Sequence, residues 1–139
     1  LAKKVVGAIR SVVGSGSVVL HEPQFNGNEW EYLKECLEST FVSSVGEFVG
    51  RFESDLAAYT GVKYAVAVVN GTSALHIACL ALCLEKGDWL WTSPNSFVAS
   101  ANCGLYCKAK VDFIDIDAQT YNISVDKLEK KTNSSKKRK

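Results

Sequence analysis

Neither sign of charge dominates this chain, and no apolar run in it is long enough to span a membrane. Its 139 residues carry a net charge of +1 at pH 7, so we expect neither nucleic acid nor a membrane as a partner. Methionine is absent as well, which indicates that Leu1 is not the original start. Arg10 interrupts the apolar run that follows Lys3 and Lys4, so this segment does not fit a signal peptide, and we expect the protein in the cytoplasm.

Metal-binding and nucleotide-binding motifs are also missing. The five cysteines follow neither CxxC nor Cys/His finger spacing, and only His21 and His76 are available as further ligands. We therefore expect no metal site and interpret the cysteines as small core residues in a reducing compartment. No GxGxxG or GxxxxGK(S/T) pattern points to a dinucleotide or to nucleoside triphosphate hydrolysis. No Ser/His/Asp arrangement points to a nucleophilic hydrolase.

The most informative stretch is residues 65–84, AVAVVNGTSALHIACLALCL. Its first five residues are small or β-branched and apolar without alternation, which predicts a strand covered on both faces. Residues 70–73 supply turn and N-cap types, and residues 74–84 predict a buried helix. A helix that starts directly after such a turn leaves backbone N–H groups unpaired, and these groups bind anions, most often phosphate. We therefore predict a phosphate-type site at Gly71, Thr72 and Ser73.

Helical spacing governs the residues before this stretch. A helix is predicted at residues 2–13, and another is predicted to begin at Asn28, with Glu31 completing a capping box. A third is expected to end at Gly61 in a left-handed conformation and to bury an apolar stripe in the core. That stripe consists of Phe48, Phe52, Leu56 and Tyr59.

Strand-like and helical segments alternate after this stretch. Strands are predicted at residues 89–92 and 111–116, with a helix of small residues at 97–106 between them. A last helix is expected to begin at Ser124 as its N-cap. Strands separated by helices are typical of an α/β fold whose parallel strands are joined by right-handed crossovers.

Three motifs lie in this half of the chain: NGTSALHIA, then WTSPNSFVASAN after a Gly-Asp pair, then VDFIDIDAQTYNI. In type, order and spacing they resemble the DegT/DnrJ/StrS family of sugar aminotransferases, which use pyridoxal 5′-phosphate. The resemblance implies a three-layer α/β/α fold, with this chain as the N-terminal part of the large domain of a fold-type I pyridoxal-phosphate-dependent transferase. It covers residues 1–131, as an N-terminal segment and a partial cofactor-binding domain, and leaves residues 132–139 as a non-homologous basic tail.

Two further segments, LHEPQFNGNEW and STFVSSVGEFVGRFE, resemble one subgroup of this family. That subgroup aminates a nucleotide-linked 4-keto-6-deoxy sugar on the way to bacillosamine- or legionaminic-type sugars, in cell-surface polysaccharide biosynthesis. The resemblance therefore implies a nucleotide-sugar substrate, an amino-acid donor that is usually glutamate, and a homodimer.

The resemblance also assigns roles to residues. Gly71 and Thr72 would offer backbone N–H groups to the cofactor phosphate, and the hydroxyl of Thr72 or Ser73 would add a bond. Phe97 stands where the family places an aromatic ring against the pyridine face of the cofactor. The loop with Ser43, Ser44 and Gly46 resembles a segment on the substrate side.

The chain departs from the family in its catalytic residues. Transamination needs a Schiff-base lysine and an acidic residue that keeps the pyridine nitrogen protonated, and no residue of this chain stands in either motif. The alternative is a non-catalytic remnant that binds a phosphate-bearing ligand or pairs with a longer homologue. Lys108 replaces a glycine that the family usually has at a helix end, which costs about 1 kcal/mol if the backbone there is left-handed.

Overall fold

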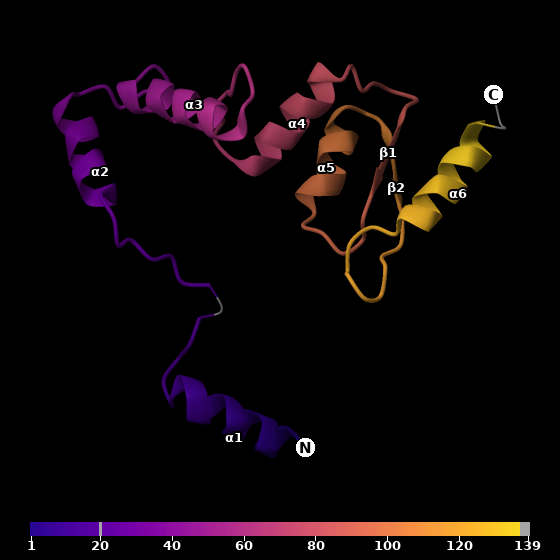
Figure 1. The fold of residues 1–139 in the computed structure, drawn as a ribbon, viewed down its shortest axis with the longest axis horizontal. Helices are drawn as coiled ribbons and strands as arrows, with labels where there is room; N and C mark the ends of the chain where they lie inside the picture. The colour runs from indigo at the N-terminus through magenta and orange to yellow at the C-terminus, as the bar shows by residue number, and fades with distance from the viewer. Residues whose placement is uncertain (20, 137–139) are drawn as a thin grey trace. The chain divides into compact units, whose positions relative to one another are not determined.

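The computed structural model describes residues 1–19 and 21–136, and the chain divides into two compact units, Leu1–Asp55 and Leu56–Lys139. The first unit holds α1 (Ala2–Val13), α2 (Glu29–Glu38) and most of α3 (Glu47–Thr60) (Figure 1). The second holds the end of α3, then α4 (Gly71–Ala81), β1 (Trp89–Thr92), α5 (Ala99–Tyr106), β2 (Lys110–Phe113) and α6 (Val125–Lys136). The predicted basic tail lies outside the described residues from position 137 onward.

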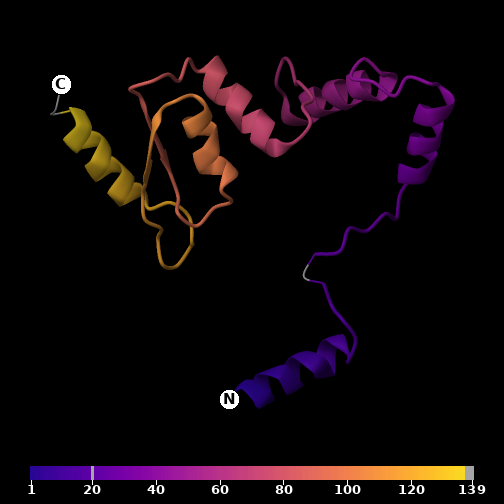
Figure 2. The same cartoon turned by 180° about the vertical axis from the view of Figure 1, so that it is seen from behind.

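A β–α–β unit organises the second half. Strands β1 and β2 pair in parallel, with Trp89 opposite Lys110 and Thr92 opposite Phe113. Helix α5 connects them and packs against both strands, and α4 lies beside α5 (Figures 1 and 2). Parallel strands need such a crossover because no tight turn can join them. The predicted α/β class is confirmed.

Three cysteines form the core of this unit. Cys79 of α4 packs with Cys103 of α5 and with Cys107 at the end of α5, and Leu84 and Leu90 cover the cluster. Burial, with a smaller contribution from the neighbouring thiols, raises the pKa of Cys79 to about 11. The thiols therefore act as small apolar residues, as predicted.

The remaining two cysteines do not belong to this core. Cys36 is half-buried in the first unit, and Cys83 is exposed. For Cys83 the prediction of a core position was wrong, because α4 ends at Ala81 and the chain turns at Cys83 with φ 57°.

Gly104 sets how closely α5 approaches the sheet. A Cβ atom at this position would lie 2.8 Å from Cδ2 of Leu90 and 3.0 Å from Cγ2 of Val111, one residue from each strand. Gly104 itself is buried. Only a residue without a side chain allows the helix to lie this close.

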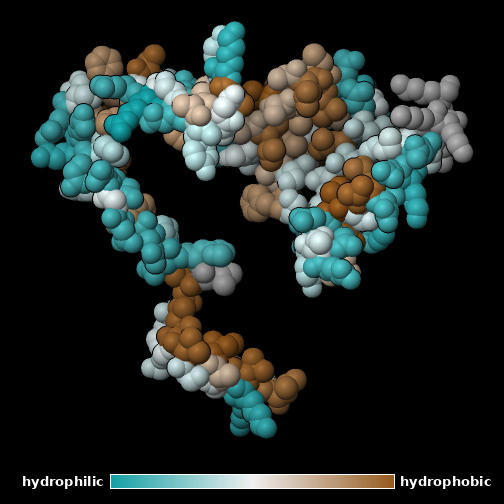
Figure 3. Space-filling view, in the orientation of Figure 1, coloured by the Kyte–Doolittle hydropathy of each residue, from teal (hydrophilic) through white to brown (hydrophobic). Residues whose placement is uncertain are grey.

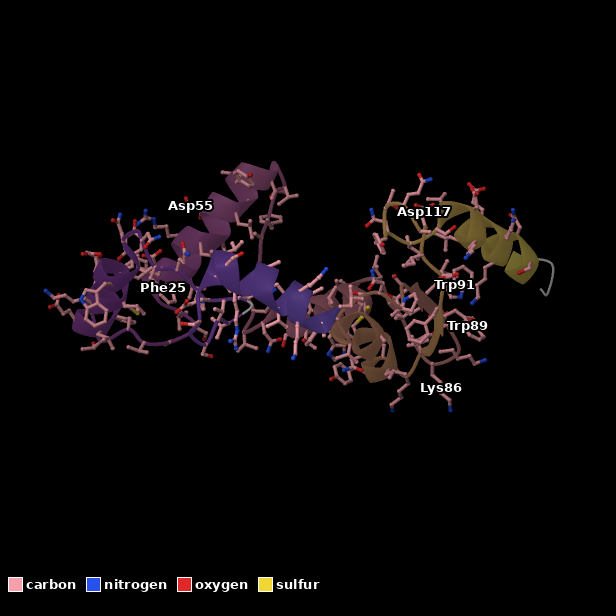
Figure 4. The ribbon with its side chains drawn as sticks, turned by 90° about the horizontal axis from the view of Figure 1, so that it is seen from below. Phe25, Asp55, Lys86, Trp89, Trp91 and Asp117 are labelled. Carbon is pink, nitrogen blue, oxygen red and sulfur yellow. The ribbon has the colours of Figure 1, made fainter. Side chains whose placement is uncertain are left out.

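Trp89 and Trp91 lie two residues apart on β1 and so point to the face of the strand opposite Leu90 (Figure 4). The Lys110 ammonium lies 5.3 Å from the ring centroid of Trp89. The indole N–H of Trp91 is buried and has no acceptor within the described part of the chain.

Helices α4 and α5 end in the same way. Each is closed by two crossed backbone hydrogen bonds of 2.9 and 3.0 Å, the Schellman arrangement, in which the residue after the C-cap is left-handed. That residue is Cys83 in α4 and Lys108 in α5, with φ of 57° and 61°. The four bonds join Leu84 to Cys79, Cys83 to Leu80, Ala109 to Gly104 and Lys108 to Leu105. The backbone at Lys108 is left-handed, so the condition for the penalty at this position is met.

Residues 65–69 differ from their prediction, because they are not part of the sheet. Val66 and Val69 are 74% and 88% exposed. An apolar run without alternation shows that a strand suits the segment, but a strand also needs a neighbouring backbone to pair with. In the described residues, β1 and β2 pair with each other and leave this segment outside the ladder.

Several helices and strands also begin or end at residues other than those predicted. The helix expected at 74–84 begins at Gly71, the one expected from 97 begins at Ala99, and the strand expected at 111–116 ends at Phe113. Beyond that strand, Ile116 forms only an isolated antiparallel bridge with Ile123. The polar cap Asn70 sets the start of α4, whereas α5 begins after Val98, which makes no side-chain capping bond. Apolar spacing alone misplaced both starts.

The capping box predicted at Asn28 does not form. Asn28 is the N-cap of α2 but its side chain makes no capping bond, and the Glu29 carboxylate instead accepts from the backbone N–H of Gly27 at 2.9 Å. Gly61, in contrast, ends α3 with φ 72° as expected.

The apolar stripe of α3 is not a core in this structure. Phe52, Leu56 and Tyr59 are 55%, 38% and 89% exposed, so the prediction of burial was wrong for them. Phe48 is half-buried and contacts the Tyr32 ring with centroids 5.5 Å apart. An amphipathic stripe shows which face a helix can bury, whereas burial also requires a second element to cover that face.

Two ion pairs hold helix α6 against the end of β2. The Ser124 hydroxyl accepts from the Lys127 N–H at 3.4 Å and confirms Ser124 as the N-cap. Lys127 pairs with Asp115, and Lys131 pairs with Asp112. Hydrogen bonds from these lysines, followed by backbone N–H groups, hold the pKa of both aspartates below the ordinary value.

We expect Gly104→Ala to destabilise the second unit by about 1–3 kcal/mol, because the new methyl group must displace Leu90 or Val111. The midpoint of urea unfolding, followed by tryptophan fluorescence, measures this. Gly50→Ala in α3, where a Cβ atom would meet nothing within 4 Å, is the matched control and should not lower the midpoint. An unchanged midpoint for Gly104→Ala would contradict the close approach.

We expect Lys108→Gly to stabilise the chain by about 1 kcal/mol, because glycine removes the penalty of a left-handed side-chain-bearing residue. The midpoint of urea unfolding, followed by tryptophan fluorescence, measures this gain. Lys108→Ala removes the ammonium but keeps the Cβ atom, so it should give no such gain. A gain of equal size in Lys108→Ala would show that charge, and not backbone conformation, is responsible.

Acid should loosen α6 from β2. Because the folded pKa of Asp112 and Asp115 is lowered, their stabilisation is present above the ordinary value of 3.8 and is lost as pH falls through the lowered values. Amide hydrogen exchange in α6 should therefore accelerate as the pH falls below about 4, beyond its intrinsic pH dependence. In a Lys127→Met, Lys131→Met double variant this additional acceleration should disappear, and its persistence would rule out the ion pairs as its cause.

Candidate functional site

The N-terminus of α4 presents free backbone donors. Asn70 is its N-cap, with extended backbone, and its side-chain oxygen accepts from the Ser73 N–H at 2.8 Å. The Ala74 N–H donates to the Asn70 carbonyl at 3.1 Å. The N–H groups of Gly71 and Thr72 have no acceptor among the residues that the structure describes. Two adjacent donors at the positive end of a helix dipole are the elements of an anion site.

Gly71 leaves these donors uncovered. A Cβ atom placed there would meet nothing within 4 Å, and Gly71 is not among the glycines with positive φ. Neither the packing nor the backbone conformation of the described chain therefore requires glycine at this position. The space beside the N–H groups is open to a ligand that approaches the backbone closely. Thr72 and Ser73 are half-buried next to it.

Phe97 lies at the other predicted cofactor position, just before α5, and is 78% exposed. Its ring borders a hollow of about 210 Å³ at the carboxyl ends of β1 and β2. The hollow is lined by Thr92, Ser93, Pro94, Ser96, Phe97, Val98, Ser100, Ala101 and Phe113. In α/β folds ligands bind at this end of the strands.

The turn and the hollow share one end of the second unit. The N-termini of α4 and α5 and the carboxyl ends of both strands lie together there, as both views show (Figures 1 and 2). Residues Gly71, Thr72 and Ser73 do not line the hollow itself. A ligand that used both would have to extend from the helix end to the Phe97 ring.

His76 lies one turn into α4 and is half-buried. Its ring meets that of Tyr106 in α5 edge-on, with centroids 5.3 Å apart. This contact packs α4 against α5 and supports a structural interpretation of His76.

Ser43, Ser44 and Gly46 belong to the first unit. Ser43 and Gly46 line a small pocket of about 120 Å³ with residues of α2 and α3, and Ser44 does not. The Ser43 hydroxyl accepts from the Val45 N–H at 3.2 Å. A Cβ atom at Gly46 would lie 3.0 Å from the Phe41 carbonyl oxygen, so a larger residue there would crowd this turn.

The described part of the chain offers few other groups that could bind a metal or act in catalysis. No group of three or more His, Cys, Asp or Glu residues is placed to hold a metal ion among residues 1–19 and 21–136. Asp117 is used locally, because backbone N–H bonds from Thr120 and Gln119 lower its pKa. None of the described helices has the length and apolar character needed to cross a bilayer.

One site residue escaped prediction as such. Asn70 was grouped with the turn and N-cap types but given no role in the site, yet its side chain binds the Ser73 N–H and leaves those of Gly71 and Thr72 without an acceptor among the described residues. Its position three residues before Ser73 was the available signal, since an N-cap side chain bonds to the third helical N–H.

Comparison with known proteins agrees with this geometry. Residues 23–138 match the DegT/DnrJ/EryC1/StrS aminotransferase family. The chain is 43% identical over 107 residues to the GDP-perosamine synthase of Caulobacter vibrioides, which covers 77% of this chain and 29% of that protein. The chain therefore spans less than a third of the length of this relative.

Solved structures show the same fold. An aminotransferase from Psychrobacter cryohalolentis has a TM-score of 0.73 and 32% identity, over 78% of this chain and 28% of that one. The E. coli GDP-4-keto-6-deoxy-D-mannose-3-dehydratase, solved with bound hydrated pyridoxal phosphate, has a TM-score of 0.73 and 28% identity, over 82% and 31%. These neighbours are fold-type I enzymes that depend on pyridoxal phosphate. The α/β unit and the free end of α4 agree with the family match over residues 23–138. That match shows that this chain belongs to the DegT/DnrJ/EryC1/StrS aminotransferase family.

Proposed function

We propose that this chain carries the N-terminal part of a pyridoxal-phosphate-dependent aminotransferase that acts on a nucleotide-linked 4-keto-6-deoxy sugar. The amino donor in this proposal is glutamate, and the product enters bacillosamine- or legionaminic-type sugars of cell-surface polysaccharides. Names of similar proteins support the substrate class, since they include a GDP-perosamine synthase and an enzyme of a GDP-linked 4-keto-6-deoxy sugar. The observation that carries the proposal is the open pair of N–H groups at Gly71 and Thr72.

The residues present fit the phosphate of this cofactor. The N–H groups of Gly71 and Thr72 would donate to its oxygens, with the hydroxyl of Thr72 or Ser73 adding a bond. The helix dipole of α4 favours the negative charge at this end. The open space beside Gly71 admits the close approach that such bonds require.

Phe97 would orient the ring of the cofactor. Its exposed face borders the hollow at the strand ends, and a flat aromatic side chain restrains a planar ligand by stacking. The bound cofactor supplies an electron sink, and the protein contributes binding and orientation. Ser43, Ser44 and Gly46 are proposed for the substrate side. We assign the reacting lysine and its acidic partner to none of the residues of this chain.

The proposal includes a homodimer in the cytoplasm. All five cysteines of the chain are free, which is typical of proteins in a reducing compartment. The large exposed apolar residues of α4, Leu75, Ile77 and Leu80, are 41–52% exposed, and a second subunit is one means of covering such a face.

A non-catalytic remnant is the second candidate. It stays a candidate because no lysine of the given sequence stands in the Schiff-base motif of the family. Such a remnant would bind a phosphate-bearing ligand or pair with a longer homologue, and in either form it would not catalyse transamination. Reading the coding DNA beyond the Lys131 codon in all frames separates them, because an aminotransferase gene would contain the lysine motif downstream.

Ligand binding to the purified full chain tests the phosphate site. Pyridoxal phosphate should bind roughly tenfold or more tightly than pyridoxal, which lacks the phosphate. Asn70→Asp keeps the N-cap acceptor but adds a negative charge beside the site, so it should weaken pyridoxal phosphate binding about tenfold without lowering stability. Asn133→Asp, which makes the same change in α6, is the matched control and should bind normally.

Equal affinity for the two ligands would contradict the phosphate site. Borohydride treatment of the mixture should leave no ligand attached to the protein. A reduced adduct on one specific lysine would place the reacting amine within this chain and would overturn our assignment.

A further inference from the structure

The dipeptide Asn-Gly occurs twice in this chain, at Asn26–Gly27 and at Asn70–Gly71. Asparagine is one of the thermally labile residues, because its side-chain amide can react with the backbone nitrogen of the next residue. Glycine in that next position favours the reaction, since it has no Cβ atom to hinder the approach and has the widest backbone freedom. The two dipeptides therefore share one intrinsic reactivity, and their surroundings decide which of them reacts in the folded chain.

This reaction forms a ring and releases ammonia. The glycine nitrogen loses its proton and attacks the side-chain carbonyl carbon, Cγ, of the asparagine. A new C–N bond closes a five-membered succinimide ring, and the side-chain nitrogen leaves with that proton as ammonia. Water then adds to one of the two ring carbonyl groups, and the ring opens to aspartate or isoaspartate. The attack requires the side chain and the following peptide group to rotate toward each other.

Asn70 is held against this rotation at the start of α4. Its side-chain oxygen accepts from the Ser73 N–H at 2.8 Å, and its backbone carbonyl accepts from the Ala74 N–H at 3.1 Å. That carbonyl belongs to the same peptide group as the attacking nitrogen of Gly71. Rotation of the group therefore breaks both bonds and unwinds the first turn of α4, which is itself packed against α5.

Asn26 is held much less. It and Gly27 lie outside every helix and strand, and its side-chain nitrogen donates to the Gln24 side chain at 3.5 Å, a long and weak contact. The Gly27 N–H donates to the Glu29 carboxylate at 2.9 Å, but this acceptor is a side chain that can move away without unwinding a helix. Residues 21–29 are mostly hydrophilic and are coloured mainly teal in Figure 3, which suits a reaction that consumes water.

We propose that spontaneous deamidation of the folded chain occurs at Asn26–Gly27 and spares Asn70–Gly71. The product carries aspartate or isoaspartate at position 26 and one additional negative charge, so the net charge of +1 falls to zero. The same change at position 70 would place a carboxylate beside the N–H groups of Gly71 and Thr72, where it would repel an anion. The cap of α4 thus protects the candidate site from modification. The proposal concerns the chain alone and is independent of the cofactor.

Peptide mapping by mass spectrometry tests the proposal after incubation of the full chain at mildly alkaline pH. Trypsin places the two dipeptides in separate peptides, residues 11–34 and 64–86. Asn26 should deamidate roughly tenfold faster than Asn70, because opening at Asn70 breaks the additional bonds of a helix start. In urea, which unfolds α4, the two rates should agree within about twofold. Equal rates in the folded chain, no reaction at Asn26, or a difference that persists in urea would each overturn the proposal.

A matched pair of variants tests the protective role of the cap. Ser73→Pro removes the N–H that binds the Asn70 side chain, and proline is tolerated in the first turn of a helix. It should raise the rate at Asn70 about fivefold and leave the rate at Asn26 unchanged. Ser73→Ala keeps the N–H and should leave both rates unchanged. Equal rates at Asn70 in the two variants would contradict the protection, and the comparison in urea stays decisive if the proline variant does not fold.

Discussion

The close packing of α5 on the β1–β2 pair is the contact on which the second unit depends. It requires a residue without a side chain at Gly104, because the Cβ atom of any other residue would meet Leu90 and Val111 at 3.0 Å or less. The same approach brings Cys103 and Cys107 against Cys79 and so fixes α4 beside α5. The free end of α4 then lies at the same edge as the carboxyl ends of the strands (Figure 1). Glycine and small sulfur side chains thus position the candidate site.

Local features of this fold were predictable from sequence, and pairing was not. The strand at residues 89–92, the Ser124 N-cap and the left-handed Gly61 depend on neighbouring residues, and the structure confirms each. Residues 65–69 and the α3 stripe depend on partners distant in the chain, and both predictions were wrong. The residue pattern of a helix or strand indicates which surface that element can bury. Whether another element covers that surface is decided by the rest of the assembly.

In the candidate site, too, local features were predictable from sequence and contacts between distant parts of the chain were not. The turn at residues 70–73, where α4 begins, was predicted from residue type alone. Its capping geometry leaves two N–H groups without an acceptor among the described residues, as an anion site requires. Motif resemblance was needed to select Phe97, because an exposed aromatic beside a hollow has no single meaning on physical grounds. Ser43 and Gly46 line a pocket in the other unit, and a residue pattern alone contains no information about how separate units meet.

The raised pKa of Cys79 has a practical consequence for labelling. A thiol with a pKa of about 11 is almost entirely protonated in neutral solution, and the protonated form reacts poorly with alkylating reagents. Cys103 and Cys107 share its burial, whereas Cys83 is exposed at the end of α4. A maleimide dye would therefore attach preferentially to Cys83, one residue beyond the α4 C-cap, ahead of the half-buried Cys36. A spectroscopic reporter at that position would follow the joint between α4 and the sheet without disturbing the sulfur cluster.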